Sequence, residues 1–325
     1  MLPFIIRRLI VSILVLLVST FGVFVLQANS GNPLATLTQR QPPPPPSTIN
    51  ALRDQLHLNV PVPIRYFYWL GGVLHGDLGK NINGIPVNSQ IFARLGTTLQ
   101  LVVVAMLVAV ILAIITGVIS AVKQYSVVDY STTFIGFILI SIPTFWMAGL
   151  LKDVAIRINQ NAGSQIFSFS GQSTPDYNGG FFGNISDRAS HLILPTITLA
   201  LISYASWSRY QRASMLDVLN SDYMRLARAK GVPWRKVLVK HGLRTALIPL
   251  TTVVAVGFGA IIGGAVVTET VFDWHGMGEY LLQAATTIDT NEMLAWLLFS
   301  AMAVVVFNLI ADILYAVLDP RIRLA

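Results

Sequence analysis

Long apolar runs constrain this chain more than any other feature of its sequence. Only 11% of its 325 residues are charged and 54% are hydrophobic, whereas a soluble domain carries roughly 25% charged residues. The chain therefore cannot cover itself with a polar surface, and a run of about 20 apolar residues can cross a bilayer as a helix. We predict an all-α polytopic membrane protein with six transmembrane helices, at residues 9–28, 97–121, 132–151, 192–208, 245–268 and 293–318.

The first run follows Arg7 and Arg8, and a signal peptide would begin in the same way. However, the run is longer than the apolar region of a signal peptide and no Ala-x-Ala cleavage pattern follows it, so we expect a retained helix. Five prolines at 42–46 then predict a stiff, extended polyproline stretch. After them, Ser47 or Thr48 would cap a short helix.

A basic segment at 221–249, which we call the cationic hairpin, lies between the fourth and fifth apolar runs. Asn220 or Ser221 would cap a first short helix. Gly231 suits the left-handed residue that ends it, and Pro233 suits the first position of a second helix. The segment therefore predicts two short helices joined by a tight turn.

One side of that second helix is expected to be apolar, because its larger side chains recur at helical spacing. A polar helix-turn-helix between membrane spans needs a protein partner or a layer of lipid headgroups. Alternatively, it is a charged loop that only fixes the orientation in the membrane. The residues of the expected apolar side are Trp234, Val237, Leu238 and His241.

The distribution of Lys and Arg predicts the orientation. Fourteen of the 22 would lie on the side that holds both termini and the cationic hairpin, and eight would lie on the other side. Cytoplasmic loops carry an excess of Lys and Arg, so we place both termini and the hairpin in the cytoplasm. The polar segment 152–190 is expected to be a loop on the other side, with the third span ending by Leu151.

The sequence contains no catalytic or nucleotide-binding motif. Gly79 and Lys80 resemble the end of a phosphate-binding loop, but Leu74 and Asn81 stand where that motif needs Gly and Ser or Thr. The five histidines lack the His-Glu-x-x-His spacing, and no serine lies in a nucleophile elbow. Cysteine is absent. We therefore expect a chain that is not an enzyme and holds no cofactor or metal of its own.

Two polar or small-residue features lie inside the expected spans. Asn308 and Asp312 are four residues apart and share one face of the last helix. An intramembrane carboxylate is a candidate functional site, such as a proton relay; alternatively, it hydrogen-bonds to a neighbouring helix. The fifth span carries a small-residue face that would serve helix packing or the transport pathway. That face comprises Gly257, Gly259, Gly263 and Gly264.

The hairpin sequences ARAKG and HGLRTALIP resemble the cytoplasmic "EAA" loop of inner-membrane permease subunits of bacterial ABC importers. The chain is similar to B-type permeases of the dipeptide, oligopeptide and nickel branch over nearly its whole length. The motifs that carry this resemblance are ALRDQLHL, RYFYWLGGVLHGDLGK, SIPTFW, HLILPTITLAL, GGAVVTETVF and LYAVLDPRIR.

The resemblance implies a type I ABC importer permease fold with cytoplasmic coupling helices. It divides the chain into an N-terminal tail and first span at 1–28, an extracytoplasmic segment at 29–93, a permease core at 94–318 and a cytoplasmic tail at 319–325. The coupling loop within the core would occupy 209–245. The polar segment 152–190 is longer than the family's pattern leads us to expect.

The resemblance also implies which residues couple the chain to an ATPase. The first helix of the hairpin would dock into a groove on an ATP-binding subunit, an approach that favours small residues. Arg in place of the family's first Glu agrees with the peptide branch, whereas Leu226 is bulkier than the usual small residue. The family's Glu-Ala-Ala, Gly and Leu-Pro positions fall on Arg225, Leu226, Ala227, Gly231, Leu243 and Arg244.

The implied partners are a second homologous permease, one or two cytoplasmic ABC ATPases that bind ATP and Mg²⁺, an extracytoplasmic binding protein and the lipid bilayer. No nucleic acid is implied. The cargo would be a di- or oligopeptide, with nickel, glutathione or another small ligand left open. Two other interpretations remain. One is a secondary transporter coupled to ions through Asp312; the other is a membrane-anchored nucleic-acid-binding regulator, which leaves five spans unexplained.

Overall fold

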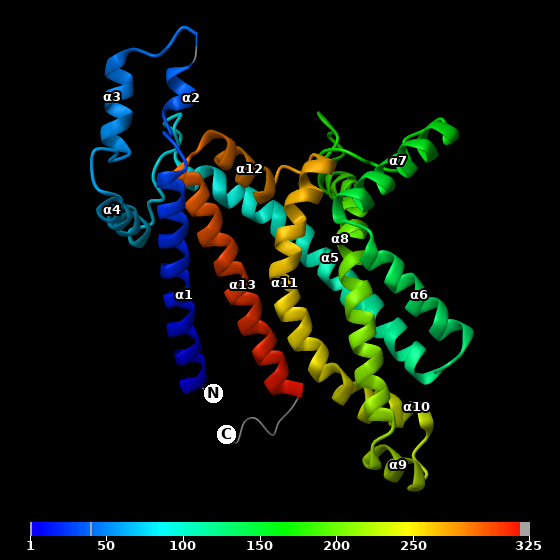
Figure 1. Cartoon of the computed structure of the whole chain (residues 1–325). Helices are drawn as coiled ribbons and strands as arrows, with labels where there is room; N and C mark the ends of the chain where they lie inside the picture. Colours follow the sequence, from blue (N-terminus) through cyan, green and yellow to red (C-terminus); the bar gives the residue numbers. More distant parts are fainter. Residues whose placement is uncertain (1, 40, 319–325) are drawn as a thin grey trace. The chain divides into compact units, whose positions relative to one another are not determined.

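Helices are the regular secondary structure of the residues that the computed structural model describes, 2–39 and 41–318. An isolated bridge joins Lys80 and Pro86. The expected tail at 319–325 lies outside the described residues. The all-α prediction is confirmed. Figure 1 shows the helices, which are α1 Leu2–Asn29, α2 Ala35–Thr38, α3 Pro46–Gln55, α4 Val62–Leu74, α5 Val87–Val122, α6 Val127–Ser141, α7 Thr144–Ala162, α8 Gly180–Leu219, α9 Asp222–Ala229, α10 Trp234–Lys236, the π-helix η1 Val237–Leu243, α11 Arg244–Phe272, α12 Met277–Thr287 and α13 Thr290–Leu318.

Five of these helices, α1, α5, α8, α11 and α13, are long and apolar enough to cross a membrane. The pair α6 and α7 passes the same test together, which makes six spans if the pair is one broken span. The span expected over 132–151 is not one continuous helix, because α6 and α7 meet there at an angle of 105°. Pro143 has no N–H to continue α6, and it forces Ile142 into an extended conformation (ψ 121°).

The polar segment after the third span is shorter than expected. The helix α7 continues to Ala162 rather than ending by Leu151, and Gly163 closes it at φ +64°. One reason is that α7 is buried along one side, where Ala148 and Ala155 pack in a cluster with residues of α8 and α11. In addition, Lys152 Nζ donates to the carbonyl of Val271 at 2.7 Å, so a charged residue is accommodated inside the helix.

The fourth span is longer than its apolar run. The helix α8 covers 40 residues and begins at Gly180, whereas the hydropathy of the sequence predicted only 192–208. Its first turns are polar, so apolar character alone could not reveal them. Pro195 lies inside the helix and is buried. The non-helical segment between α7 and α8 is therefore 163–179 and not 152–190.

The helices gather into two compact units. The first unit comprises the described residues through Thr98 together with His275–Val305. The second comprises Leu99–Trp274 together with the described residues from Val306 on. Consequently, α5 and α13 are each divided between the two units.

In the first unit, the end of α1 packs against α4. The Tyr66 hydroxyl lies 2.9 Å from Thr20 Oγ1 in α1, and Phe24 packs beside Trp69 and Leu294. The expected cap at Ser47 or Thr48 is wrong, because α3 begins at Pro46. Proline needs no hydrogen bond at the first helical position, so the last of the five prolines starts the helix instead of extending the polyproline stretch.

The loop before α5 is held by the start of α13. Glu292 accepts from Asn81 Nδ2 at 2.9 Å, and the buried Asp289 accepts from the backbone N–H of Ile82 at 2.6 Å. A second contact joins α5 to α12, where Arg94 Nη1 lies 2.9 Å from Glu279 Oε2. These charged contacts fix the loop 79–86 within the first unit.

Helices α8 and α11 form the most extensive helix pair of the second unit, and α6 and α7 pack against α8. At Gly257 the two helices approach so closely that a Cβ atom would lie 2.9 Å from the Trp207 ring. Phe258 of α11 also stacks on Phe307 of α13 with ring centroids 3.6 Å apart. The second unit therefore supplies a packed helical frame for the cationic hairpin.

Candidate functional site

The cationic hairpin forms the short helices α9 and α10 and leads through η1 into α11. Ser221 precedes α9 with an extended backbone, as predicted for a cap, although its hydroxyl bonds to Val218 and not to the helix N-terminus. Gly231 has φ +76°, the left-handed conformation predicted from its place after α9. Pro233 is the residue before α10, one position earlier than predicted, with Trp234 beginning the helix.

A hydrophobic cluster fixes the hairpin on the helix ends of the second unit. In Figure 1, α9 and α10 lie at one end of α8 and α11. Met224 of α9 is 1% exposed and belongs to this cluster together with side chains of α5, α8, η1 and α11. Ala227 packs against its edge. The fully buried members are Ala121, Met215, Val218, Met224, Val237 and Ala246. The hairpin is therefore part of the packed second unit and not a detached loop.

The π-helix changes which residues of the second hairpin helix are buried. The expected apolar side is wrong for Trp234 and His241, which are exposed, and right for Val237 and Leu238. Gly242 is buried instead, five residues after Val237. A π-helix bonds residue i to i+5 and so shifts the phase of every later side chain relative to an α-helix.

The two faces of α9 differ in character. Its inner face holds Met224 and the half-buried Ala227, whereas Tyr223 and Leu226 expose 43% and 57% of their surfaces on the outer face. Arg225 is also exposed and lies 3.7 Å from the carboxylate of Asp222. A helix with two large apolar side chains left exposed beside arginines has the character of a surface that another protein covers.

The remaining predicted hairpin residues lie at the other end of the turn. Leu243 is half-buried as the last residue of η1, and Arg244 is exposed at the start of α11. Trp234 stacks under Arg228, whose guanidinium carbon lies 5.3 Å from the ring centroid. The structure thus brings the six predicted coupling positions together in one helical hairpin.

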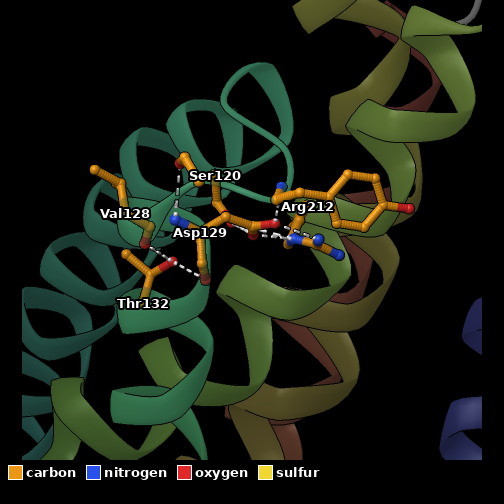
Figure 2. Close-up of polar contacts among 7 residues, drawn as sticks. Ser120, Val128, Asp129, Thr132 and Arg212 are labelled. Carbon is orange, nitrogen blue, oxygen red and sulfur yellow. Dashed lines mark hydrogen bonds and ion pairs between the residues drawn. The ribbon is translucent and has the colours of Figure 1, made fainter.

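A buried ion pair beside the hairpin was not predicted from the sequence. Arg212 of α8 binds Asp129 of α6 through two hydrogen bonds, Nε to Oδ1 at 2.6 Å and Nη2 to Oδ2 at 2.7 Å. Ser120 of α5 donates to the same carboxylate. Figure 2 shows Asp129 between Ser120 and Arg212, so one carboxylate joins three helices. We call these three residues the Asp129 junction.

The Asp129 junction is well satisfied. The carboxylate is 3% exposed and also accepts from the backbone N–H of Tyr125 at 3.0 Å. A bidentate, charge-assisted pair of this kind is strong and geometrically specific. The sequence carried one signal of it: Ser126 and Asp129 have the spacing of a helix cap, and Ser126 does accept from the Asp129 N–H. Nothing in the sequence pointed to Arg212, 83 residues away.

Close backbone packing adjoins the junction. A Cβ atom on Gly117 of α5 would lie 2.8 Å from the Gln211 side chain and 2.9 Å from the Ser208 carbonyl of α8. Gln211 is fully buried. The two helices therefore approach each other at a point where only glycine fits.

The predicted glycine face of α11 divides between two environments. Gly257 and Gly264 face α8 and line a pocket of about 230 Å³. A Cβ atom on Gly263 would meet no atom within 4 Å, and Gly259 is half-buried. The glycines that pack against α8 are thus not the Gly-x-x-x-Gly pair, 259 and 263.

The polar pair of the last span, Asn308 and Asp312, lies on one face of α13. Asn308 and Asp312 are both half-buried on α13, four residues apart, as predicted. Among the described residues, no group of three or more His, Asp or Glu side chains is placed to hold a metal ion.

Comparisons with known proteins identify the family and the fold of the chain. Residues 113–324 match the family model "Binding-protein-dependent transport system inner membrane component", and residues 1–89 match the model of the N-terminal part of such components. The structure also resembles a solved chain from the MetNI methionine ABC transporter in an inward-facing conformation. That likeness has a TM-score of 0.52 and 14% identity, and it covers 71% of this chain and 96% of the other.

Characterised relatives align along nearly the full chain. The oligopeptide transport system permease protein AppB of Bacillus subtilis is 42% identical over 99% of this chain and all of its own length. OppB of Mycobacterium tuberculosis, also named an oligopeptide permease, is 40% identical over 98% of both chains. The dipeptide permease DppB of Escherichia coli is 35% identical over 84% of both. With its type I importer fold, the chain belongs to the family of inner membrane components of binding-protein-dependent ABC transport systems.

Proposed function

We propose that this chain is one of two permease subunits of an ABC importer for di- and oligopeptides. The relatives that share 35–42% of its sequence are named as dipeptide or oligopeptide permeases. The observation that carries the proposal is the cationic hairpin, which is anchored in the helical frame while its outer face stays exposed. A membrane chain that has no nucleotide-binding motif needs such a surface to receive work from a partner.

In this proposal, an ATP-binding subunit docks on the outer face of α9. Tyr223 and Leu226 would enter the groove of the ATPase, with Arg225 at its rim. Ala227 and Gly231 would support this surface from its inner side. Ala227 packs α9 against the hydrophobic cluster, and Gly231 permits the tight turn. Leu243 and Arg244 would join the hairpin to α11. ATP and Mg²⁺ would be bound by one or two ATPase subunits, and this chain would hold no cofactor.

Closure of the ATPases would move the hairpin together with its frame. The Asp129 junction ties α5, α6 and α8 together near the hairpin, so these helices would move as one body. Gly257, Gly259, Gly263 and Gly264 would contribute to helix packing or to the pathway. Asn308 and Asp312 of α13 would likewise contribute to helix packing or to the pathway.

The proposed orientation places both termini and the hairpin in the cytoplasm, with the segment 29–93 outside for contact with the binding protein. The permease core would be 94–318. Single cysteines at Ser173, Asn220 and Thr287 test this, because the chain has no cysteine of its own. A membrane-impermeant thiol reagent applied to intact cells should label positions 173 and 287 and spare position 220. Labelling at position 220 would overturn the orientation.

The function itself is tested by deleting the gene in its host. We expect uptake of a radiolabelled tripeptide to be lost while uptake of the corresponding free amino acid is retained. A plasmid copy of the wild-type gene should restore peptide uptake. If the deletion strain instead loses uptake of nickel or glutathione and still imports every peptide tested, the importer carries a different cargo.

A further inference from the structure

The first unit contains a pocket that the coupling function does not use. Its volume is about 330 Å³, at the lower end of the roughly 300–1,000 Å³ typical of small-molecule sites. The walls come from the end of α1, the segment around α4, the loop before α5 and the start of α13. We call it the first-unit pocket.

Aromatic side chains form one side of this pocket. Phe24, Tyr68 and Trp69 all line it, and the His57 ring lies against Tyr68 with centroids 4.8 Å apart. The indole Nε1 of Trp69 is buried and has no hydrogen-bond acceptor among the described residues.

Two cations line the same pocket without a carboxylate partner in the described part of the chain. Arg65 is half-buried, and its guanidinium carbon lies 5.1 Å from the Phe24 ring centroid. Lys80 is more exposed, and its backbone carbonyl accepts from Asn291. An unpaired, half-buried guanidinium beside an aromatic ring is suited to bind a carboxylate, which it can hold through two parallel hydrogen bonds.

The two carboxylates that line the pocket are already used by the backbone. Asp77 Oδ1 accepts from the N–H of Gly79 at 2.9 Å, and Asp289 Oδ2 accepts from the N–H of Ile82 at 2.6 Å. Burial raises the pKa of Asp289, because a buried carboxylate loses its hydration. Both carboxylates are therefore engaged by backbone N–H groups, whereas Arg65 and Lys80 have no carboxylate partner among the described residues.

Close packing fixes the loop that presents Lys80. Gly79 has φ +83°, and a Cβ atom there would lie 2.8 Å from the Asn291 side chain. A Cβ atom on Gly72 would lie 2.9 Å from the carbonyl oxygen of Asp77. The backbone that leads to Lys80 is thus held by close packing.

We propose that the first-unit pocket binds the free carboxylate end of a short peptide whose last side chain is apolar. The carboxylate lies at Arg65 and Lys80, and the side chain lies against Tyr68, Trp69 and Phe24. This inference rests on the proposed peptide-import function and adds a peptide-binding site on the permease itself. It predicts that the permease prefers peptides with an uncharged, apolar C-terminal residue and a free C-terminus.

The test uses the complete importer in lipid nanodiscs, without the binding protein. The probes are tritiated Ala-Ala-Phe and its C-terminal amide, whose binding is measured at equilibrium. The acid should bind to the wild type at least about tenfold more tightly than the amide, and Arg65→Gln should weaken binding of the acid by about 10- to 100-fold, as expected for the loss of a charge-assisted hydrogen bond. Lys80→Gln should have a smaller effect, and Arg65→Lys should restore part of the affinity.

Arg53→Gln is the matched control, because Arg53 is an exposed arginine of the same segment outside the pocket. It should bind Ala-Ala-Phe like the wild type. Equal binding of the acid and the amide to the wild type would overturn the proposal, and that comparison needs no variant to fold. Unchanged affinity in a folded Arg65→Gln variant would overturn it as well.

A second arm identifies the source of the carboxylate. The binding protein, free of peptide, is titrated onto wild-type and Arg65→Gln importer. If Arg65→Gln weakens this docking while Ala-Ala-Phe shows no carboxylate-dependent binding, the pocket receives a side chain of the binding protein and the proposal is wrong. Peptide transport by the wild-type importer is measured separately, in proteoliposomes with ATP inside and the binding protein outside. Transport without carboxylate-dependent binding contradicts only the pocket, whereas absent transport contradicts the proposed function.

Discussion

The Asp129 junction and the first-unit pocket use half-buried arginines in opposite ways. Arg212 makes two short hydrogen bonds to a carboxylate, and the cavity beside it has only about 10 Å³, at most the space of a single water. Arg65 has no carboxylate partner among the described residues and lines a pocket of about 330 Å³. An arginine paired with a carboxylate within the fold holds helices together, whereas a half-buried arginine without such a partner beside a cavity is available to a ligand.

The largest effect is expected from breaking the junction. Asp129→Ala leaves the Arg212 guanidinium, 28% exposed, without its partner, and removing one member of a buried pair costs about 3 kcal/mol or more. We expect a clear fall in the thermal unfolding midpoint of the purified importer. Arg65→Gln should destabilise the importer less. It leaves no carboxylate without a partner and removes only a cation–π contact worth about 1 kcal/mol or less. Equal destabilisation by the two variants would contradict the distinction drawn between the two arginines.

Adding a methyl group beside the junction should have the next largest effect. In Gly117→Ala, the new Cβ meets the Gln211 side chain and a backbone carbonyl below 3 Å, and such overpacking costs about 1–3 kcal/mol. Gly149→Ala is the matched control, since its Cβ would meet nothing within 4 Å. We expect its unfolding midpoint to stay level or rise slightly, because alanine favours helix over glycine. A Gly117→Ala variant as stable as Gly149→Ala would show that α5 and α8 do not approach closely.

At the hairpin, Gly231→Val should act more on coupling than on stability. A β-branched residue at φ +76° is strained by about 1–2 kcal/mol. We expect the variant to reach the membrane but to hydrolyse ATP with less peptide transported per ATP. Gly231→Asn should behave more like the wild type, because asparagine tolerates the left-handed conformation. The measurement is the ratio of peptide uptake to ATP hydrolysis. If Gly231→Val has the wild-type ratio, the hairpin does not couple ATP hydrolysis to transport.

The smallest effect concerns acid stability in the first unit. Burial would raise the pKa of Glu279, but a hydrogen bond with His275 and the charge of Arg94 outweigh it and hold the pKa below the usual value for glutamate. A depressed folded-state pKa contributes stability above the unfolded-state pKa, and this stability is lost as the pH falls through the folded-state pKa. The carboxylate is 44% exposed, so we expect at most about 1 kcal/mol. Unfolding midpoints measured down to pH 3 should fall less steeply in Glu279→Gln than in the wild type; parallel curves would contradict this.

Local signals predicted much of the fold, and contacts distant in sequence account for what they missed. Apolar runs located the spans because a bilayer helix needs about 20 apolar residues, and Gly231 was predicted because glycine readily adopts positive φ. The bend at Pro143 was missed because both flanking helices are apolar. The inverted burial of His241 and Gly242 was missed because an α-helical period was assumed where the chain forms a π-helix. The Asp129 junction could not be predicted, since its residues come from three helices.

The variants above test what holds the permease together. Peptide import itself is tested most directly by one measurement. The complete importer is placed in proteoliposomes with the binding protein outside, and uptake of tritiated Ala-Ala-Phe is followed with ATP inside and the proton gradient collapsed. We expect uptake that needs internal ATP, the ATPase subunits and the binding protein. Uptake by the permease subunits alone, driven by a proton gradient and independent of ATP, would contradict it.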